Sequence, residues 1–258
     1  MKLKIKGEIQ YYVDETIESS GGLSHIFTTR FGGFSTGPLY SMNMSPTREN
    51  PETVIMNYKA VCKCENIPVE KCVLSHQTHT NNIRIVTEQD AGKRLFVPSD
   101  IYDVDGLVTN VRNLPLVIFY ADCVPILLYD PVKKVVATVH AGWRGTVSNI
   151  VGNAVIIMKE NFGTNPDDIL ASIGPSIGPC CFETGEEVRD EFIKAGLSDC
   201  IIGKNINLQE ANKIFLKTSG VRTISISGLC TKCRCDEFYS HRGCGPDTGR
   251  MALIACLK

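Results

Sequence analysis

The sequence predicts an α/β (α+β) fold in one domain spanning residues 1–258, and three observations support this. Short apolar runs rich in Val and Ile outnumber the segments with helical spacing. Many neighbouring runs are joined by tight turns such as 130–134, which favours hairpins and a mixed or antiparallel sheet over regular βαβ winding. With 258 residues, 43% of them hydrophobic, the chain can bury a full core, and it contains no linker or repeat.

Four helices can be placed from their start and stop signals. The clearest has Asn50 as a cap and Pro51 in its first turn, followed by apolar residues at helical spacing. Gly163 is a stop signal for a second helix, and Asn207 with Glu210 resembles a capping box for the last. The expected ranges are 51–62, 147–162, 186–195 and 207–220.

Strands are expected wherever three to six residues rich in Val and Ile lie between turn signals. These segments surround the helices along the whole chain rather than alternating with them one by one. The expected strands are 26–29, 72–74, 83–86, 116–120, 124–129, 135–139, 169–173, 223–227 and 251–255.

Charge and cysteine content exclude several classes of protein. With 27 basic and 28 acidic residues the net charge is −1, which argues against a nucleic-acid binder with a basic face. No apolar stretch approaches the roughly 18 residues of a membrane span, so we expect no membrane partner. The N-terminal segment MKLKIKGEIQYYV lacks the apolar core of a signal peptide. We therefore expect a cytoplasmic protein whose 12 cysteines are reduced.

Three polar segments adjoin apolar, strand-like runs and contain residues suited to chemistry. They are 75–79 (SHQTH), 121–125 (ADCVP) and 140–145 (HAGWRG). His79, Cys123 and His140 would provide the three protein ligands of a catalytic zinc site, which keeps its fourth position for water. The alternative is that each histidine caps a strand while Cys123 is an ordinary buried thiol.

These segments, with five others in the same order along the chain, resemble the YfiH/YlmD family. The resemblance therefore covers nearly the whole chain. Three positions depart from the family pattern: Thr80 replaces a Gly after the ligand histidine, His241 replaces a Tyr, and Tyr58 follows Asn57 where an Arg is often found. The further matching segments are 29–35 (TRFGGFS), 105–109 (DGLVT), 173–183 (IGPSIGPCCFE), 238–242 (FYSHR) and 248–250 (TGR).

The resemblance implies a layered α/β/β/α sandwich with mixed sheets and a defined chemistry. Family members are described as purine nucleoside phosphorylases that split adenosine, inosine, guanosine and methylthioadenosine with phosphate, and that also deaminate adenosine. The metal implied is zinc, with copper possible because an older description of the family is laccase-like. The expected partners are a purine nucleoside and phosphate, and the expected assembly is a monomer or a homodimer.

Given that chemistry, further residues can be assigned roles. Asp122 or Glu183 would act as the catalytic proton shuttle in deamination. Guanidinium groups match phosphate oxygens, so arginines in the matched segments are candidates for substrate binding. These are Arg30, Arg144, Arg242 and Arg250.

Four other functional hypotheses remain open. A laccase-like copper polyphenol oxidase needs more histidine ligands than the five present readily supply. A metal-free hydrolase would use Cys123 as nucleophile and His140 as base, and a non-catalytic protein would bind purines in the same pocket. A second, structural zinc is suggested by Cys230 and Cys233, with Cys235 and Cys244 as the less well spaced half of that site.

Overall fold

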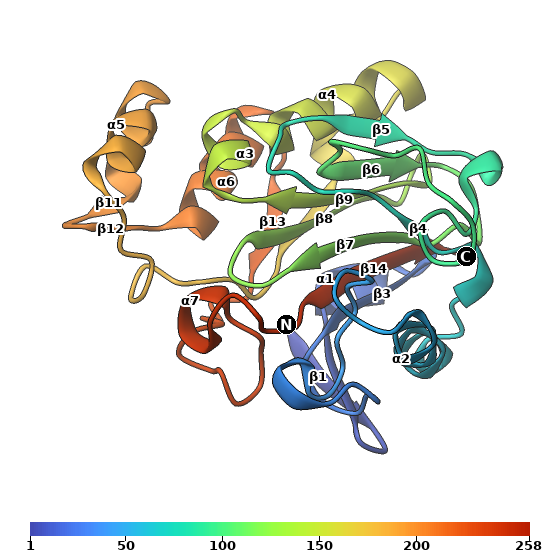
Figure 1. Cartoon of the computed structure of the whole chain (residues 1–258). Coiled ribbons are helices and arrows are strands. Elements are labelled where there is room, and N and C mark those ends of the chain that lie inside the picture. Colours follow the sequence, from blue (N-terminus) through green and yellow to red (C-terminus); the bar gives the residue numbers. More distant parts are fainter.

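The computed structural model describes residues 1–258 and places two six-stranded sheets face to face, with helices outside them (Figure 1). The first sheet has the order β1 (Lys2–Lys6), β2 (Ile9–Val13), β3 (Leu23–Thr28), β14 (Met251–Leu257), β7 (Leu116–Tyr120) and β4 (Val73–Leu74). The second has the order β13 (Thr223–Ile226), β10 (Leu170–Ile173), β8 (Val124–Asp130), β9 (Val135–Ala141), β6 (Gly106–Thr109) and β5 (Ile83–Ile85). A separate two-stranded sheet pairs β11 (Ile201–Ile202) with β12 (Asn205–Ile206).

Both large sheets are mixed. In the first, β4 and β7 run parallel. In the second, β5 pairs parallel with β6, and β10 pairs parallel with β13. The remaining neighbours are antiparallel, and tight turns such as the one between β8 and β9 connect some of them. The predicted hairpins and mixed sheet, in place of regular βαβ winding, are therefore confirmed.

The structure has seven α-helices. They are α1 (Glu15–Ser20), α2 (Pro51–Cys64), α3 (Trp143–Val147), α4 (Ile150–Phe162), α5 (Glu186–Lys194), α6 (Leu208–Thr218) and α7 (His241–Cys244). Short 3₁₀ turns occur at Gly37–Leu39, Val69–Lys71, Glu88–Asp90, Pro166–Asp168 and Ser198–Cys200. No helix combines the length and apolar character needed to cross a bilayer.

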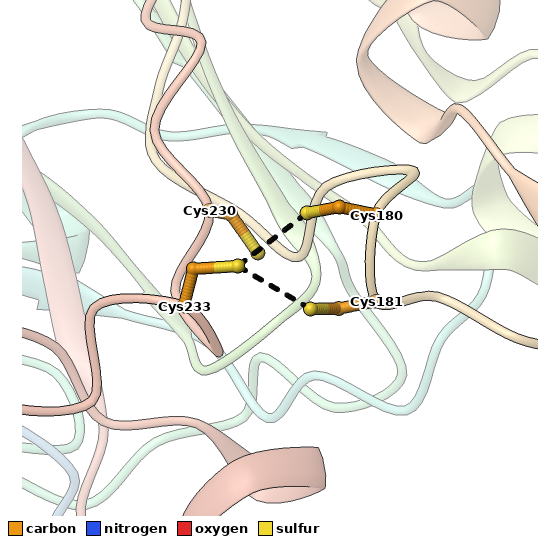
Figure 2. Close-up of side chains that lie close together, drawn as sticks. All are labelled: Cys180, Cys181, Cys230 and Cys233. Carbon is orange, nitrogen blue, oxygen red and sulfur yellow. Dashed lines mark hydrogen bonds between the residues drawn. The ribbon is translucent and has the colours of Figure 1, made fainter.

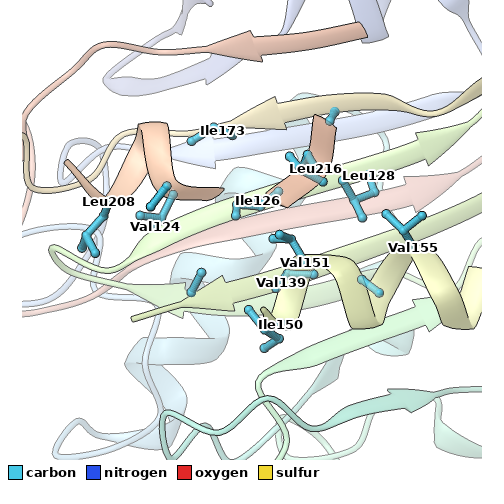
Figure 3. Close-up of a cluster of buried hydrophobic side chains, with 14 of the residues drawn as sticks. Val124, Ile126, Leu128, Val139, Ile150, Val151, Val155, Ile173, Leu208 and Leu216 are labelled. Carbon is cyan, nitrogen blue, oxygen red and sulfur yellow. The ribbon is translucent and has the colours of Figure 1, made fainter. Parts of the chain in front are cut away.

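Three apolar clusters correspond to the three interfaces between layers. Leu127 of β8 and Leu253 of β14 belong to the cluster between the two sheets. Val151 of α4 packs with β8, β9 and α6 on the outer face of the second sheet (Figure 3). Tyr58 of α2 packs on the outer face of the first. This order of layers is the α/β/β/α sandwich that the resemblance implies, and the fold prediction is confirmed.

The predicted helix signals act as expected. The Asn50 side chain accepts a hydrogen bond from the backbone N–H of Glu52 at the start of α2, and Asn207 caps α6 in the same way. Gly163 ends α4 with a φ of 68°, the left-handed conformation that favours glycine. The helix expected over 147–162 is interrupted at its start, because Asn149 adopts a φ of 53° between α3 and α4.

The strands β1, β2 and β6 were not among those expected from apolar patterning. In β1, Lys2, Lys4 and Lys6 alternate with apolar residues, and all five positions are exposed or half-buried at the sheet edge. Its apolar content is therefore too low to stand out. β6 is fully buried but only four residues long, and it begins with a glycine.

The crossing between the two sheets positions the functional site. The chain leaves the first sheet at the end of β7 and enters the second at β8, with only residues 121–123 between them. In the hairpin that follows, Pro125 near the start of β8 lies opposite His140 near the end of β9. The short crossing therefore brings Cys123 and His140 to the same edge of the sandwich.

Candidate metal centre and active-site cavity

The structure brings together the three side chains that the sequence proposes as metal ligands. His79 lies in the loop after β4, Cys123 in the crossing between sheets, and His140 on β9. Their ligand atoms all lie within 4.8 Å of one another. The two imidazole rings are 5.1 Å apart between centroids at an interplanar angle of 70°. Two nitrogens and a sulfur therefore converge on one point from three separate elements.

Asp105, fully buried directly before β6, organises this centre. The Nδ1 of His140 donates to Asp105 Oδ1 at 2.8 Å, which leaves Nε2 as the nitrogen available to a metal. The same carboxylate accepts hydrogen bonds from the loop that carries His79. Its donors there are the N–H groups of Thr78 (3.2 Å), His79 (3.1 Å) and Thr80 (2.7 Å), and the Thr80 hydroxyl (2.9 Å).

Gln77 fixes the other side of the same loop. Its amide nitrogen donates to the carbonyl of Phe119 at 2.8 Å, and its amide oxygen accepts from the N–H of Phe119 at 2.7 Å. The side chain thus pairs with the backbone of β7 as a neighbouring strand would. Between these two anchors His79 adopts a φ of 65°. A strained, well-anchored residue of this kind is typical of functional sites.

The charges of the three groups reinforce one another. Burial alone would raise the pKa of Asp105, but hydrogen bonds from His140 and Thr80 lower it to about 2. Burial would also raise the pKa of Cys123, yet the charge and hydrogen bond of His140, with a smaller contribution from His79, lower it to about 6. Burial would lower the pKa of His140, but Cys123 and Asp105 raise it to about 10. The thiolate, which is the form that binds metals, is therefore favoured.

Gly142 leaves room for two of the ligands. A Cβ atom at this position would lie 2.8 Å from His79 Cδ2 and 3.2 Å from Cys123 Sγ. Its φ of −70° is open to any residue, so close approach, and not backbone conformation, requires the glycine. This accounts for the first glycine of the HAGWRG segment.

A cavity of about 400 Å³ opens beside the three ligands. Apolar side chains form part of its lining, and three arginines and a single carboxylate form much of the remainder. The lining residues are Ser45, Thr47, Gln77, His79, Arg94, Phe119, Tyr120, Ala121, Asp122, Cys123, His140, Ile177, Phe182, His241, Arg242 and Arg250. A second cavity of about 320 Å³ shares Ser45, Thr47, His241 and Arg250 with it.

Of the four arginines expected to bind substrate, Arg242 and Arg250 line the cavity, whereas Arg30 and Arg144 do not. Arg30 donates to the carbonyls of Tyr40 and Cys235, so its guanidinium joins two loops. Arg144 is exposed and lies over the ring of Trp143 at 4.2 Å.

The two carboxylates expected to move protons are placed differently. Asp122 lines the cavity and adopts a φ of 83°. It accepts 2.7 Å hydrogen bonds from the hydroxyls of Thr231 and Ser240 and from the N–H of Arg242. Glu183 is exposed and does not line the cavity, although its backbone carbonyl accepts a hydrogen bond from Arg242.

Two features of the site were missed by reasoning from the sequence. Arg94 lines the cavity, where it donates to the Ser75 carbonyl and lies 5.4 Å from the Phe119 ring centroid. No apolar strand or motif precedes it, so the sequence carried no signal. Asp105 stands in the matched DGLVT segment, and its position directly before a buried strand was the available signal.

A sandwich of this kind, with a His/Cys/His group where the chain crosses between its sheets, defines a class of α/β/β/α proteins with a candidate metal site. The sequence model of the family described as multi-copper polyphenol oxidoreductase laccase matches residues 24–258, and the chain belongs to this family.

Known relatives agree with the expected resemblance to YfiH and YlmD. The purine nucleoside phosphorylase YlmD of Bacillus subtilis (strain 168) is 37% identical over 243 residues, covering 90% of this chain and 87% of the relative. The adenosine deaminase RL5, from an unknown prokaryotic organism, is 35% identical over 195 residues, covering 71% and 74%. The crystal structure of the Bacillus licheniformis hypothetical protein YfiH superposes with a TM-score of 0.91 at 32% identity, covering 99% of both chains. Both named activities are enzymatic, which supports an enzymatic role for this chain.

Replacing the carboxylate that orients His140 is expected to weaken metal binding. An asparagine at position 105 has no negative charge and only one acceptor oxygen, so it cannot accept from both His140 and the loop N–H groups as the carboxylate does. The affinity for metal should therefore fall about 10- to 100-fold in Asp105→Asn. Competition with a coloured chelator measures it. Asp103→Asn is the matched control, because that exposed side chain accepts only from the Thr78 hydroxyl. Equal affinity in both variants would contradict the role of Asp105.

A methyl group at position 142 is expected to displace two ligands. Gly142→Ala should lower the bound metal well below one equivalent at the His/Cys/His site while leaving the far-ultraviolet circular dichroism spectrum unchanged. Gly185→Ala is the control, because Gly185 also caps a helix, with a φ of −68°, and its Cβ would meet only the mobile Glu187 carboxylate. Full metal content in Gly142→Ala would show that the close approach is unimportant.

Proposed function

We propose that this chain is a zinc-dependent purine nucleoside phosphorylase that also deaminates adenosine. The observation that carries the proposal is the cavity itself, in which a His/Cys/His donor set, arginines and an apolar wall face the same space. The names of the relatives point to the same two activities.

The three ligands fit zinc. Two histidine nitrogens and one thiolate are donors that zinc prefers, and three protein ligands leave a fourth position for a water or substrate atom. The cavity adjoins that position. Zinc bound there would supply Lewis acidity and a bound water whose pKa is lowered to about 7.

Copper and a laccase-like activity fit the residues less well. Blue-copper sites add a weak axial methionine to a His₂Cys set, and no methionine lines the cavity. A multicopper centre needs further histidines nearby. Of the three other histidines, only His241 lines the cavity. His25 is buried elsewhere and accepts from the N–H of Asp14, and His76 stacks on Tyr102.

We assign the phosphate to Arg94 and Arg250, which both line the cavity. Burial lowers the pKa of both guanidinium groups, which shows that they are partly removed from water. The arginines that form salt bridges with carboxylates are others, so neither of these two is held in an ion pair. Partly desolvated cations without an acidic partner favour an anionic ligand. Arg30 and Arg144, outside the cavity, are not part of this assignment.

The remaining walls suit the nucleoside. Phe119, Ile177 and Phe182 supply apolar surface for the flat base. Asp122 is the single carboxylate in the lining, and we keep it as the group that stabilises positive charge on the sugar or transfers a proton. Glu183 does not face the cavity, and so its expected catalytic role finds no support in the geometry.

In this arrangement the protein's own groups bind and orient the two reactants of phosphorolysis. A phosphate oxygen attacks C1′ of the ribose while the bond from C1′ to the base nitrogen breaks, giving ribose 1-phosphate and the free base. In deamination, water adds at C6 of adenine and ammonia leaves.

A panel of adenosine, inosine, guanosine and methylthioadenosine, each with and without phosphate, tests the proposal. We expect base release that requires phosphate, and ammonia release from adenosine that does not. Chromatography of the bases and an enzymatic ammonia assay measure the two. If zinc-loaded protein forms neither product, the proposal is wrong.

The phosphate assignment predicts a specific kinetic change. Arg94→Gln and Arg250→Gln should each raise the KM for phosphate about 10-fold or more, because one charge-assisted contact is worth about 1.5–3 kcal/mol. Deamination of adenosine, which uses no phosphate, should change much less. Arg112→Gln, on an exposed turn, is the control. Unchanged phosphate KM in both variants would contradict the assignment.

One observation favours a second candidate, a metal-free cysteine hydrolase. Cys123, His140 and Asp105 form a chain of contacts like that of a catalytic triad, with the thiol beside the imidazole and the imidazole held by the carboxylate. His79 has no role in such a triad, and its convergence on the same point favours the metal.

Alkylation of the chelator-treated protein separates the two candidates. The reactive thiolate is present above the pKa of Cys123 and lost below it, so iodoacetamide should modify Cys123 half-maximally near pH 6. In His140→Asn the midpoint should move upward toward about 8.5. Peptide mass spectrometry follows the modification. Activity that survives metal removal and disappears on alkylation would establish the hydrolase.

A further inference from the structure

Four cysteines with no role in the cavity gather at a second place in the molecule. Their side chains come from two loops and point toward one another (Figure 2). All four sulfur atoms lie within 4.8 Å of one another. We call them the four-cysteine cluster, and its members are Cys180, Cys181, Cys230 and Cys233.

We propose that the four-cysteine cluster binds one zinc ion as a closed, structural tetrathiolate site. Zinc–sulfur bonds of about 2.3 Å in a tetrahedron place the sulfurs about 3.8 Å apart. Cys233 Sγ lies 3.5 Å from Cys180 Sγ and 3.4 Å from Cys181 Sγ. These two separations are slightly shorter than that value, and no pair of sulfurs is more than 4.8 Å apart.

The same distances disfavour two alternatives. A disulfide joins its sulfurs at about 2.05 Å, well below the separations in the cluster. A polynuclear iron–sulfur cluster holds its cysteine sulfurs further apart, because bridging sulfides lie between the irons. Four thiolates at this spacing therefore fit a single tetrahedral ion.

The backbone around the cluster is arranged to hold it. Cys230 and Cys233 have the two-residue spacing typical of one half of a structural zinc site. The N–H of Gly178 donates to Cys230 Sγ at 3.2 Å, a contact that stabilises a thiolate. A parallel bridge between Ser176 and Cys230 joins the two loops directly beside the sulfurs.

The cluster differs from the second zinc site expected from the sequence. That expectation paired Cys230 and Cys233 with Cys235 and Cys244. In the structure the other half comes from the loop before α5, about 50 residues earlier, whereas Cys235 Sγ donates to the Lys232 carbonyl at 3.0 Å. Cys180 and Cys181 are adjacent in the chain, which disfavours a disulfide between them, but the sulfur atoms of both lie next to Cys233 of the second loop.

Both loops held by the cluster also contact the active-site cavity or its lining. The first contributes Ile177 and Phe182 to the lining. The second supports a lining residue, because the Thr231 hydroxyl donates to Asp122 at 2.7 Å. Zinc in the cluster would therefore fix the cavity wall without touching the reactants. It is a site separate from the His/Cys/His centre and independent of the reaction proposed above.

Metal counting on purified, reduced, full-length protein tests the proposal. Inductively coupled plasma mass spectrometry should find two zinc ions per chain in the unchanged protein and one in Cys233→Ser. Cys244→Ser, an exposed cysteine outside the cluster, is the matched control and should retain two. His79→Ala should retain one, and zinc X-ray absorption on that variant should show only sulfur ligands, at about 2.3 Å.

Several outcomes would overturn the proposal. They are a single zinc that disappears entirely in His79→Ala, nitrogen ligands on the zinc that this variant retains, iron in place of zinc, or a disulfide within the cluster. The His79→Ala measurement leaves all four cysteines intact, so it decides the question even where Cys233→Ser fails to fold. Loss of nucleoside turnover with full sulfur-bound zinc would count against the proposed function and not against the cluster.

Discussion

The buried carboxylate of Asp105 is the contact on which the site depends. A carboxylate removed from water is costly unless its lone pairs are filled, and here the donors are His140 and the loop that carries His79. Satisfying Asp105 therefore sets two ligand positions at once, because it fixes the orientation of one imidazole and the backbone of the other. The low pKa of Asp105 follows from the same contacts. Folding of the loop and assembly of the centre are then one event.

The sandwich supplies the third ligand through its connectivity. A chain that stayed within one sheet would place the residue after β7 at the end of a hairpin. Here the crossing of three residues between sheets leaves Cys123 little freedom, because both flanking strands are buried in different layers. Gly142 then lets His79 and Cys123 approach each other over the start of α3. The positions of the ligands are thus set by the buried strands and by the absence of a side chain at Gly142.

Much of the architecture could be predicted from local signals, whereas partnerships across the chain could not. Caps such as Asn50 and apolar runs such as 116–120 act within a few residues, so pattern reasoning finds them. The role of Asp105 depends on a loop 25 residues away, and that of Arg94 on loops that meet only in three dimensions. The arginines of the matched segments show the limit clearly. Arg30 and Arg250 look alike in sequence, and both guanidinium groups donate to backbone carbonyls, but only Arg250 lines the cavity.

The cysteines divide by what surrounds their sulfur atoms. Cys123 is paired with two imidazoles beside a cavity, so a metal there would keep a position open to a reactant. In the four-cysteine cluster only sulfurs surround the centre, and four thiolates complete a tetrahedron without leaving such a position. Most of the other thiols, such as Cys62 and Cys72, are buried among apolar side chains and behave as small core residues. Of the 12 cysteines, one therefore belongs to the candidate His/Cys/His centre and four to the proposed four-cysteine cluster, whereas most of the others are core residues.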